Sequence, residues 1–175
     1  MPTTSKDSGV ARQLELIAAV AAEGREDQAY DDITRLAADV CGTSIALISL
    51  ADGPRLWFKT RVGLQATEIP REASFCACAM GFTQDVLVVE DATRDPRFVD
   101  NPLVTGELKI RFYAGAPLVT STGEPIGTLC TLDREPRRLD PEKLRSLQFM
   151  AQQVVAMLEG TSGTGRPAAR APVAD

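Results

Sequence analysis

Cysteines are the residues of this sequence with the widest chemical range, because a thiolate can attack an electrophile, be oxidised or bind a metal. Cys76 and Cys78 are two positions apart in the sequence. Cys76 is also two positions after Ser74, a residue that favours the start of a helix. A helix N-terminus lowers a thiol pKa, which points to redox chemistry. Free cysteines more commonly serve as small apolar core residues, so packing stands as the other interpretation.

The two remaining cysteines, Cys41 and Cys130, are far from this pair in sequence, and no C-x-x-C motif is present. A metal site is therefore not expected. The sequence has no histidine at all, which excludes Ser-His-Asp catalysis and a histidine-ligated haem. Asp95 and Asp100 flank a proline and are interpreted as turn residues rather than as an acid–base pair. No catalytic residue is assigned, and the chain is expected not to be an enzyme.

Arg111 and Tyr113 alternate with apolar residues on a strand predicted over 110–119. The two-residue period of a strand puts both side chains on one face. If the apolar face meets the terminal helices, Arg111 and Tyr113 face a pocket and hold an anionic or hydrogen-bonding ligand. The alternative is an arginine paired with Asp91 or Glu90 that fixes a loop.

Composition indicates one soluble globular domain: 175 residues, of which 44% are hydrophobic and 25% charged. The net charge is −5 and no long basic run is present, so a nucleic-acid partner is not expected. No apolar run is long enough for a membrane span, and the first residues lack the apolar core of a signal peptide. The chain is accordingly expected to be cytoplasmic, with reduced thiols.

Hydrophobic periodicity predicts an α+β domain with a mostly antiparallel sheet. Residues 1–10 and 160–175 are predicted to be disordered, and 11–159 to form the single domain. No glycine-rich phosphate-binding motif is present. The predicted helices cover 13–22, 27–40, 75–80 and 140–158, and the predicted strands cover 44–50, 55–62, 86–89, 110–119 and 125–132.

The last predicted helix begins with Asp140 and Pro141, an N-cap followed by proline at the first helical position. Apolar residues then recur at intervals of three and four up to Leu158. We expect its first half to pack on the sheet and its second half, through Val154 and Leu158, to pair with a second copy of the chain.

Sequence motifs in a fixed order carry a family resemblance; they include Ile45–Leu50, Trp57–Lys59, Pro70–Glu72, Ser74–Ala77, Val88–Ala92, Asp95–Phe98, Asn101–Val104, Ile110–Leu118 and Ile126–Cys130. Together they resemble a GAF domain, over about residues 25–159. The similar branch of that family is bacterial and usually adjoins histidine kinase or diguanylate cyclase modules.

This resemblance implies a central antiparallel sheet of five or six strands, with the N- and C-terminal helices on one face and a loop-covered pocket on the other. It implies a stand-alone sensory domain that binds a small ligand or senses redox state, forms a homodimer through its terminal helices and signals through a partner such as a histidine kinase or a cyclase. No cofactor is assigned. The expected ligand-binding residues are Phe75, Cys76, Cys78, Asp91, Arg111 and Tyr113.

The sequence departs from the family at Cys78, where similar domains often have histidine, and this also removes the usual partner of a bilin chromophore. The residue set of cyclic-nucleotide-binding relatives is absent, so cAMP and cGMP are not expected. An alternative function is an enzyme similar to the free methionine sulfoxide reductases, with a nucleophile among Cys76, Cys78 and Cys130. The cysteine spacing differs from that of those enzymes.

Overall fold

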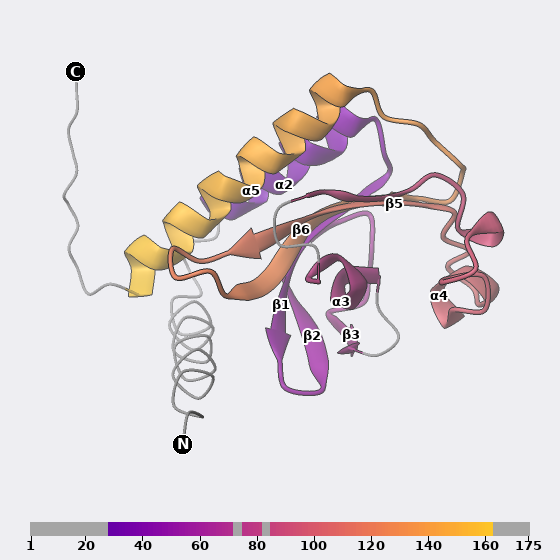
Figure 1. The fold of residues 1–175 in the computed structure, drawn as a ribbon, viewed down its shortest axis with the longest axis horizontal. Helices are drawn as coiled ribbons and strands as arrows, with labels where there is room; N and C mark the ends of the chain where they lie inside the picture. Colours follow the sequence, from indigo (N-terminus) through magenta and orange to yellow (C-terminus); the bar gives the residue numbers. More distant parts are fainter. Residues whose placement is uncertain (1–27, 72–74, 82–84, 163–175) are drawn as a thin grey trace.

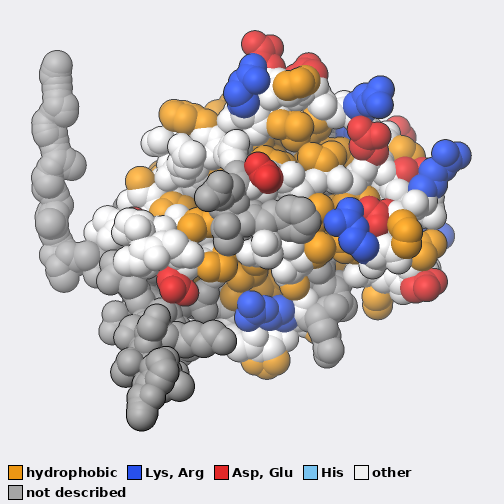
Figure 2. All heavy atoms as spheres, viewed as in Figure 1, with side chains coloured by type: hydrophobic (Ala, Val, Ile, Leu, Met, Phe, Trp, Pro, Cys, Tyr) orange, Lys and Arg blue, Asp and Glu red, His pale blue; other side chains and the backbone are white. Residues whose placement is uncertain are grey.

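The computed structural model of the protein describes residues 28–71, 75–81 and 85–162, with side chains up to 160. The helix predicted over 13–22 and the predicted disorder of 1–10 and of the last residues lie outside this part of the chain. Among the described helices, none combines the length and the apolar character needed to cross a bilayer. On the face shown in Figure 2, basic and acidic side chains are interspersed rather than gathered by sign.

Six strands form one sheet in the order β3-β2-β1-β6-β5-β4. Every neighbouring pair is antiparallel, which confirms the predicted fold class. The strands are β1 (Ile45–Asp52), β2 (Arg55–Val62), β3 (Glu68–Pro70), β4 (Leu87–Val89), β5 (Phe112–Val119) and β6 (Pro125–Asp133).

Two long helices, α2 (Gln28–Cys41) and α5 (Pro141–Ser162), lie side by side on one face of this sheet (Figure 1). The opposite face carries the short helix α3 (Phe75–Ala79). Two further turns of helix, η2 (Ala92–Arg94) and α4 (Pro102–Thr105), follow in the connection from β4 to β5. The predicted helix over 27–40 and the five predicted strands are therefore confirmed, with ends shifted by one or two residues.

The central strand β1 divides the core in two, because its side chains alternate between the faces. Ala46, Ile48 and Leu50 pack under α2 and α5. Ile45 and Leu47 pack on the other side, with α3 and the β4–β5 connection. Since both faces are covered, the strand reads as a nearly continuous apolar run in the sequence.

Helix α5 begins as its sequence predicts: the backbone N–H of Lys143 donates to Asp140 Oδ1 at 3.0 Å. Leu147, Val154 and Leu158 are all fully buried in the core of their own chain. The expectation that Val154 and Leu158 pair with a second copy is therefore wrong, because the sheet already covers this stripe. A homodimer formed by other parts of the helices stays a prediction.

Three short elements escaped prediction, and each is too short to show a hydrophobic period. β3 is a three-residue edge strand in which Ile69 pairs with Leu56 of β2. α4 follows an Asn-Pro signal: Asn101 Oδ1 accepts a hydrogen bond from the Leu103 N–H at 2.8 Å, and Pro102 takes the first helical position. η2 is capped in the same way by Asp91.

Truncation of Leu147 to alanine tests the packing of α5 on the sheet. Leu147 is fully buried, whereas Phe149, two residues on, is 60% exposed. Leu147→Ala should lower the free energy of unfolding by about 2–5 kcal/mol, from lost burial and the cavity left behind. Phe149→Ala should change it by only about 0.5 kcal/mol. Urea unfolding of both variants measures this, and equal losses would contradict the packing described here.

Candidate functional site

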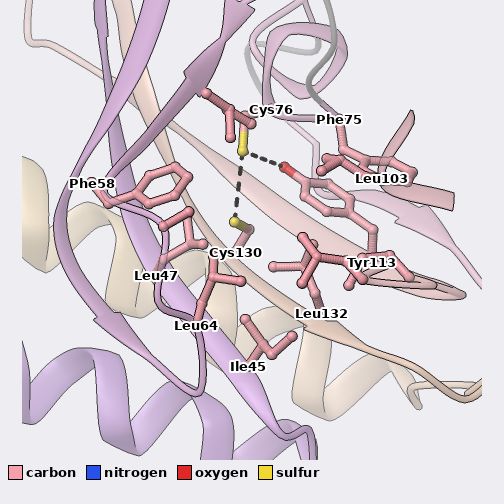
Figure 3. A pocket seen from close by; sticks show the side chains of 14 residues that line it. Ile45, Leu47, Phe58, Leu64, Phe75, Cys76, Leu103, Tyr113, Cys130 and Leu132 are labelled. Carbon is pink, nitrogen blue, oxygen red and sulfur yellow. Dashed lines mark hydrogen bonds between the residues drawn. The ribbon is translucent and has the colours of Figure 1, made fainter. Parts of the chain in front are cut away.

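A buried cavity of about 40 Å³ lies between the sheet and α3. Fourteen side chains line it, and none of them is Asp, Glu, Lys or Arg. They come from β1, β2, β5 and β6, from α3 and from the connections around β3 and α4. Figure 3 shows how several of them converge on it, among them Leu47, Phe58, Phe75, Cys76, Tyr113 and Cys130.

Three aromatic rings support one side of the cavity. The ring of Phe75 from α3 stacks on Tyr113 of β5, with centroids 5.0 Å apart and planes inclined by 14°. On its other side Phe75 contacts Phe98, at a centroid distance of 4.5 Å. Such pairs add about 0.5–1.5 kcal/mol each beyond their buried area. The stack therefore holds α3 and the β4–β5 connection against the sheet.

Five buried residues form a polar cluster in this otherwise apolar region: Ser49, Cys76, Tyr113, Thr128 and Cys130. The Tyr113 hydroxyl donates a hydrogen bond to Cys76 Sγ at 3.4 Å, and the sulfurs of Cys76 and Cys130 are 3.7 Å apart. The hydroxyls of Ser49 and Thr128 are hydrogen-bonded to each other at 2.9 Å. We call these five residues the buried polar cluster.

Gly115 makes the position of Tyr113 possible. It lies two residues further along β5, on the same face and directly opposite Cys130 of β6. A Cβ atom at position 115 would fall 2.1 Å from the Tyr113 hydroxyl oxygen and 2.5 Å from Cζ. The tyrosine ring therefore occupies the space that a side chain at 115 would take, and this brings its hydroxyl to Cys76.

Hydrogen bonding and burial shift the pKa values of the two thiols in opposite directions. The pKa of Cys76 is lowered to about 6, chiefly by its hydrogen bond with Cys130, against the opposing effect of burial and with further help from Ser49, Thr128 and Tyr113. The pKa of Cys130 is raised well above its usual value, first by burial and then by its neighbour Cys76. Cys76 is thus the thiolate of the pair and Cys130 the thiol.

Three of the six residues expected to bind a ligand line the cavity: Phe75, Cys76 and Tyr113. As the helical spacing predicts, Cys76 and Cys78 face different ways. Cys76 points at the sheet, and Cys78 is partly exposed beside Arg97. The structure therefore places the two cysteines of the suggested pair in different surroundings, and it brings Cys76 next to Cys130 instead.

The other two expected residues, Asp91 and Arg111, lie outside the cavity lining. The Arg111 guanidinium donates to the backbone carbonyls of Val104 and Ile110, each at 3.0 Å. The predicted placement of Arg111 in the pocket beside Tyr113 is therefore wrong, because Arg111 precedes β5 and turns to hold α4.

Asp91 serves the connection rather than the cavity: its Oδ1 accepts from the N–H of Thr93 at 3.0 Å and from the Thr93 hydroxyl at 2.6 Å. Those hydrogen bonds, with the nearby charges of Arg94 and Arg111, hold its pKa below the usual value. Ligand binding by any of the six expected residues stays a prediction.

Sequence reasoning gave no ligand-binding role to Ser49, Phe58, Thr128 or Cys130, and it named Cys130 only as a possible nucleophile. The two-residue period of β6 places Thr128 and Cys130 on the same face, which is a signal present in the sequence. Nothing local in the sequence shows that this face meets α3. Asp95 was interpreted correctly as a turn residue, since its carboxylate accepts from the backbone N–H and the guanidinium of Arg97.

Comparison with known proteins gives a family and a relative. The family model of the GAF domain matches residues 25–158, which confirms the resemblance found in the sequence. A cyclic di-GMP phosphodiesterase of Pseudomonas aeruginosa is 45% identical over 139 residues, 79% of this chain. The chain spans about a quarter of that relative's length, 24%.

Solved structures of low sequence identity share the fold. The GAF domain of an Acinetobacter phosphoenolpyruvate-protein phosphotransferase has a TM-score of 0.67 and 15% identity, covering 95% of this chain and 99% of its own. A type II free methionine-R-sulfoxide reductase of Thermoplasma acidophilum has a TM-score of 0.62 and 14% identity, covering 83% and 95%. At such identity the likeness shows the fold alone, and the sulfoxide reductase alternative stays a prediction.

One expectation from the sequence needs correction. The chain was expected not to be an enzyme, because it resembles a non-catalytic signalling domain and no catalytic residue was assigned. The relative of 45% identity is named as an enzyme, a cyclic di-GMP phosphodiesterase, and contradicts that expectation. Counting residue types excluded particular mechanisms, and it did not exclude a link to catalysis altogether.

Replacement of Tyr113 by phenylalanine tests the electrostatics of the buried polar cluster. Its hydroxyl donates to Cys76 and so favours the thiolate; without that donor the Cys76 pKa should rise above its value of about 6. The measurement is the ultraviolet absorbance of the Cys76 thiolate as a function of pH, because no reagent then has to enter a cavity of about 40 Å³.

Tyr30→Phe is the matched control, because Tyr30 lies in the core on the other face of the sheet. It should leave the midpoint of the Cys76 thiolate titration unchanged. A midpoint in Tyr113→Phe equal to that of the unmodified protein would contradict the assigned hydrogen bond.

Proposed function

The chain belongs to the GAF domain family, and we propose that it is the sensory domain of an enzyme that hydrolyses cyclic di-GMP. The observation that carries this proposal is the 45% identity with a cyclic di-GMP phosphodiesterase over 139 residues. In the proposal the buried cavity receives the signal, through a small ligand or through the redox state of its thiols. The phosphodiesterase that responds is a further part of the same polypeptide or a partner protein.

The chemistry of the cavity supports a signal distinct from the substrate. Cyclic di-GMP carries two negatively charged phosphodiester groups, whereas no lysine or arginine that could pair with them lines the cavity. The volume of about 40 Å³ exceeds the roughly 10–15 Å³ that one water molecule needs, and it is well below the roughly 150 Å³ of a cavity that takes benzene. The proposed ligand is accordingly small and uncharged.

The sheet offers a route from the cavity to the helices. Tyr113 and Cys130 face the cavity, and the residues just before them, Phe112 and Leu129, pack under α2 and α5. A shift of β5 or β6 caused on one face therefore reaches the other, because a close-packed core transmits displacement. In this proposal α5 carries the change to the phosphodiesterase.

The proposal also places the protein in the cytoplasm. All four cysteines are reduced thiols in the structure, and thiols persist where the compartment keeps them reduced. Redox sensing needs reduced thiols in the resting state, because an oxidant can react only with a thiol that has not yet been oxidised.

Filling the cavity tests the proposal. Ala66 lines it, and the ring added by Ala66→Phe is larger than the cavity, so this variant should leave no room for a ligand and uncouple the domain from its signal. We expect cellular cyclic di-GMP, quantified by mass spectrometry in host cells that carry the variant in place of the original, to change by about fivefold or more.

Thr67→Phe is the matched control: it adds a phenyl ring at the next position, whose side chain is exposed and lies outside the cavity lining. It should leave cyclic di-GMP unchanged. If Ala66→Phe folds with an unaltered melting temperature and behaves like Thr67→Phe, the cavity is not the sensing site and the proposal fails.

A further inference from the structure

Two cysteines that are 54 positions apart in the sequence meet at the cavity wall. Cys76 of α3 and Cys130 of β6 have their sulfurs 3.7 Å apart and pointing at each other (Figure 3). Both are buried, and both line the cavity. At this separation, only a small movement is needed for the two sulfurs to reach bonding distance.

We propose that Cys76 and Cys130 form a redox pair, in which hydrogen peroxide or a small uncharged hydroperoxide entering the cavity oxidises Cys76 and Cys130 then closes a disulfide with it. This deepens the redox form of the proposed function, on which it rests only for what the oxidation regulates. The disulfide itself stands on the geometry of the two thiols.

The first step oxidises one sulfur. The Cys76 thiolate attacks an oxygen of the peroxide, a sulfur–oxygen bond forms, and the oxygen–oxygen bond breaks. The leaving oxygen takes up a proton and departs as water, or as an alcohol from an organic hydroperoxide. Cys76 is then a sulfenic acid, oxidised by two electrons, and the peroxide has been reduced by the same two.

The second step forms the disulfide. Cys130 gives up its proton and its sulfur attacks the sulfur of the Cys76 sulfenic acid. A sulfur–sulfur bond forms, the sulfur–oxygen bond breaks, and the hydroxide that leaves takes the proton to give water. In total, two thiols and one hydroperoxide give one disulfide, one alcohol or water, and one further water.

The surroundings assign these roles. Tyr113 donates a hydrogen bond to Cys76 and so favours its thiolate, which is the form that attacks peroxide. Cys130, fully buried beside it, has a raised pKa and keeps its proton until Cys76 has been oxidised. Tyr113 is therefore a positioning residue for Cys76, held in place because Gly115 has no side chain.

Size and polarity of the cavity select the oxidant. A volume of about 40 Å³ admits a molecule little larger than water, and a mostly apolar lining without lysine or arginine favours a neutral one. Large charged disulfides are excluded on both counts. The other two cysteines stand apart: Cys41 lies in the core on the opposite face of the sheet, and Cys78 is partly exposed beside Arg97.

Disulfide closure has a structural consequence. A disulfide bond is about 2.05 Å long, so the two sulfurs must approach by about 1.7 Å. This approach draws α3 towards β6. Helix α3 carries Phe75, whose ring stacks on Tyr113 and contacts Phe98. Oxidation is thus expected to shift the aromatic stack and the two strands beneath it.

The test is disulfide mapping of the purified full chain after treatment with hydrogen peroxide in the absence of other thiols. Free thiols are alkylated under denaturing conditions, and tryptic peptides are analysed by mass spectrometry. We expect a linked pair of peptides, residues 72–94 joined to 112–134, with the loss of two hydrogen atoms. The same link should form in Cys78→Ser, which identifies Cys76 within the first peptide.

Cys130→Ser should lose the link and leave Cys76 as a sulfenic acid that dimedone traps, while Cys76→Ser should show neither product. If a serine variant fails to fold, disulfide mapping of the unsubstituted chain still tests the proposal. A link through Cys78 or Cys41, or full alkylation of Cys76 and Cys130 after peroxide treatment, overturns the proposal.

Cyclic di-GMP in peroxide-treated host cells separates the two proposals. If the redox pair is the signal, cells with Cys130→Ser should lose the response that cells with the original chain show. A Cys76–Cys130 link without any change in cyclic di-GMP would contradict the redox form of the proposed function and leave the redox pair standing.

Discussion

The absence of a side chain at position 115 is the constraint on which the cavity side of this domain depends. Because Gly115 leaves the surface of β5 open, the ring of Tyr113 lies across it and its hydroxyl reaches Cys76 Sγ, 3.4 Å away. The same ring stacks on Phe75, so α3 is fixed to the sheet by an aromatic contact and a hydrogen bond together. A methyl group at 115 would collide with that ring, and the buried polar cluster, the stack and the cavity would all have to rearrange.

Side chains alternate along each strand, and this alternation gives the two faces of the sheet different roles. On the helical face, apolar residues of β5 and β6 make a tightly packed support for α2 and α5. On the cavity face, Tyr113 and Cys130 belong to a polar cluster whose members satisfy one another in an apolar setting. Buried polar groups are costly when unpaired, so this cluster tolerates few alternative arrangements. A change there is therefore transmitted to the strands rather than absorbed locally.

The character of the cavity and the comparisons point to a division of labour. A cyclic di-GMP phosphodiesterase shares 45% identity with this chain, which spans 24% of it. The small cavity, lined by no lysine or arginine, suits a small neutral molecule far better than a cyclic dinucleotide with two phosphodiester groups. In the proposed function, a sensing site that differs in chemistry from the substrate would let the phosphodiesterase respond to conditions other than the concentration of its own substrate.

The sequence by itself determined what is encoded locally: the period of each helix and strand, the Asp140 cap of α5, the separation of Cys76 from Cys78 and the motifs of the family. It left undecided which residues distant in the chain would meet. Arg111, expected in the pocket, holds α4, and Cys130, given no place in the expected ligand site, lies 3.7 Å from Cys76. Only the tertiary structure decided these pairings. A local period fixes the face on which a side chain lies, whereas its neighbours depend on strand register and on how α3 packs across the sheet.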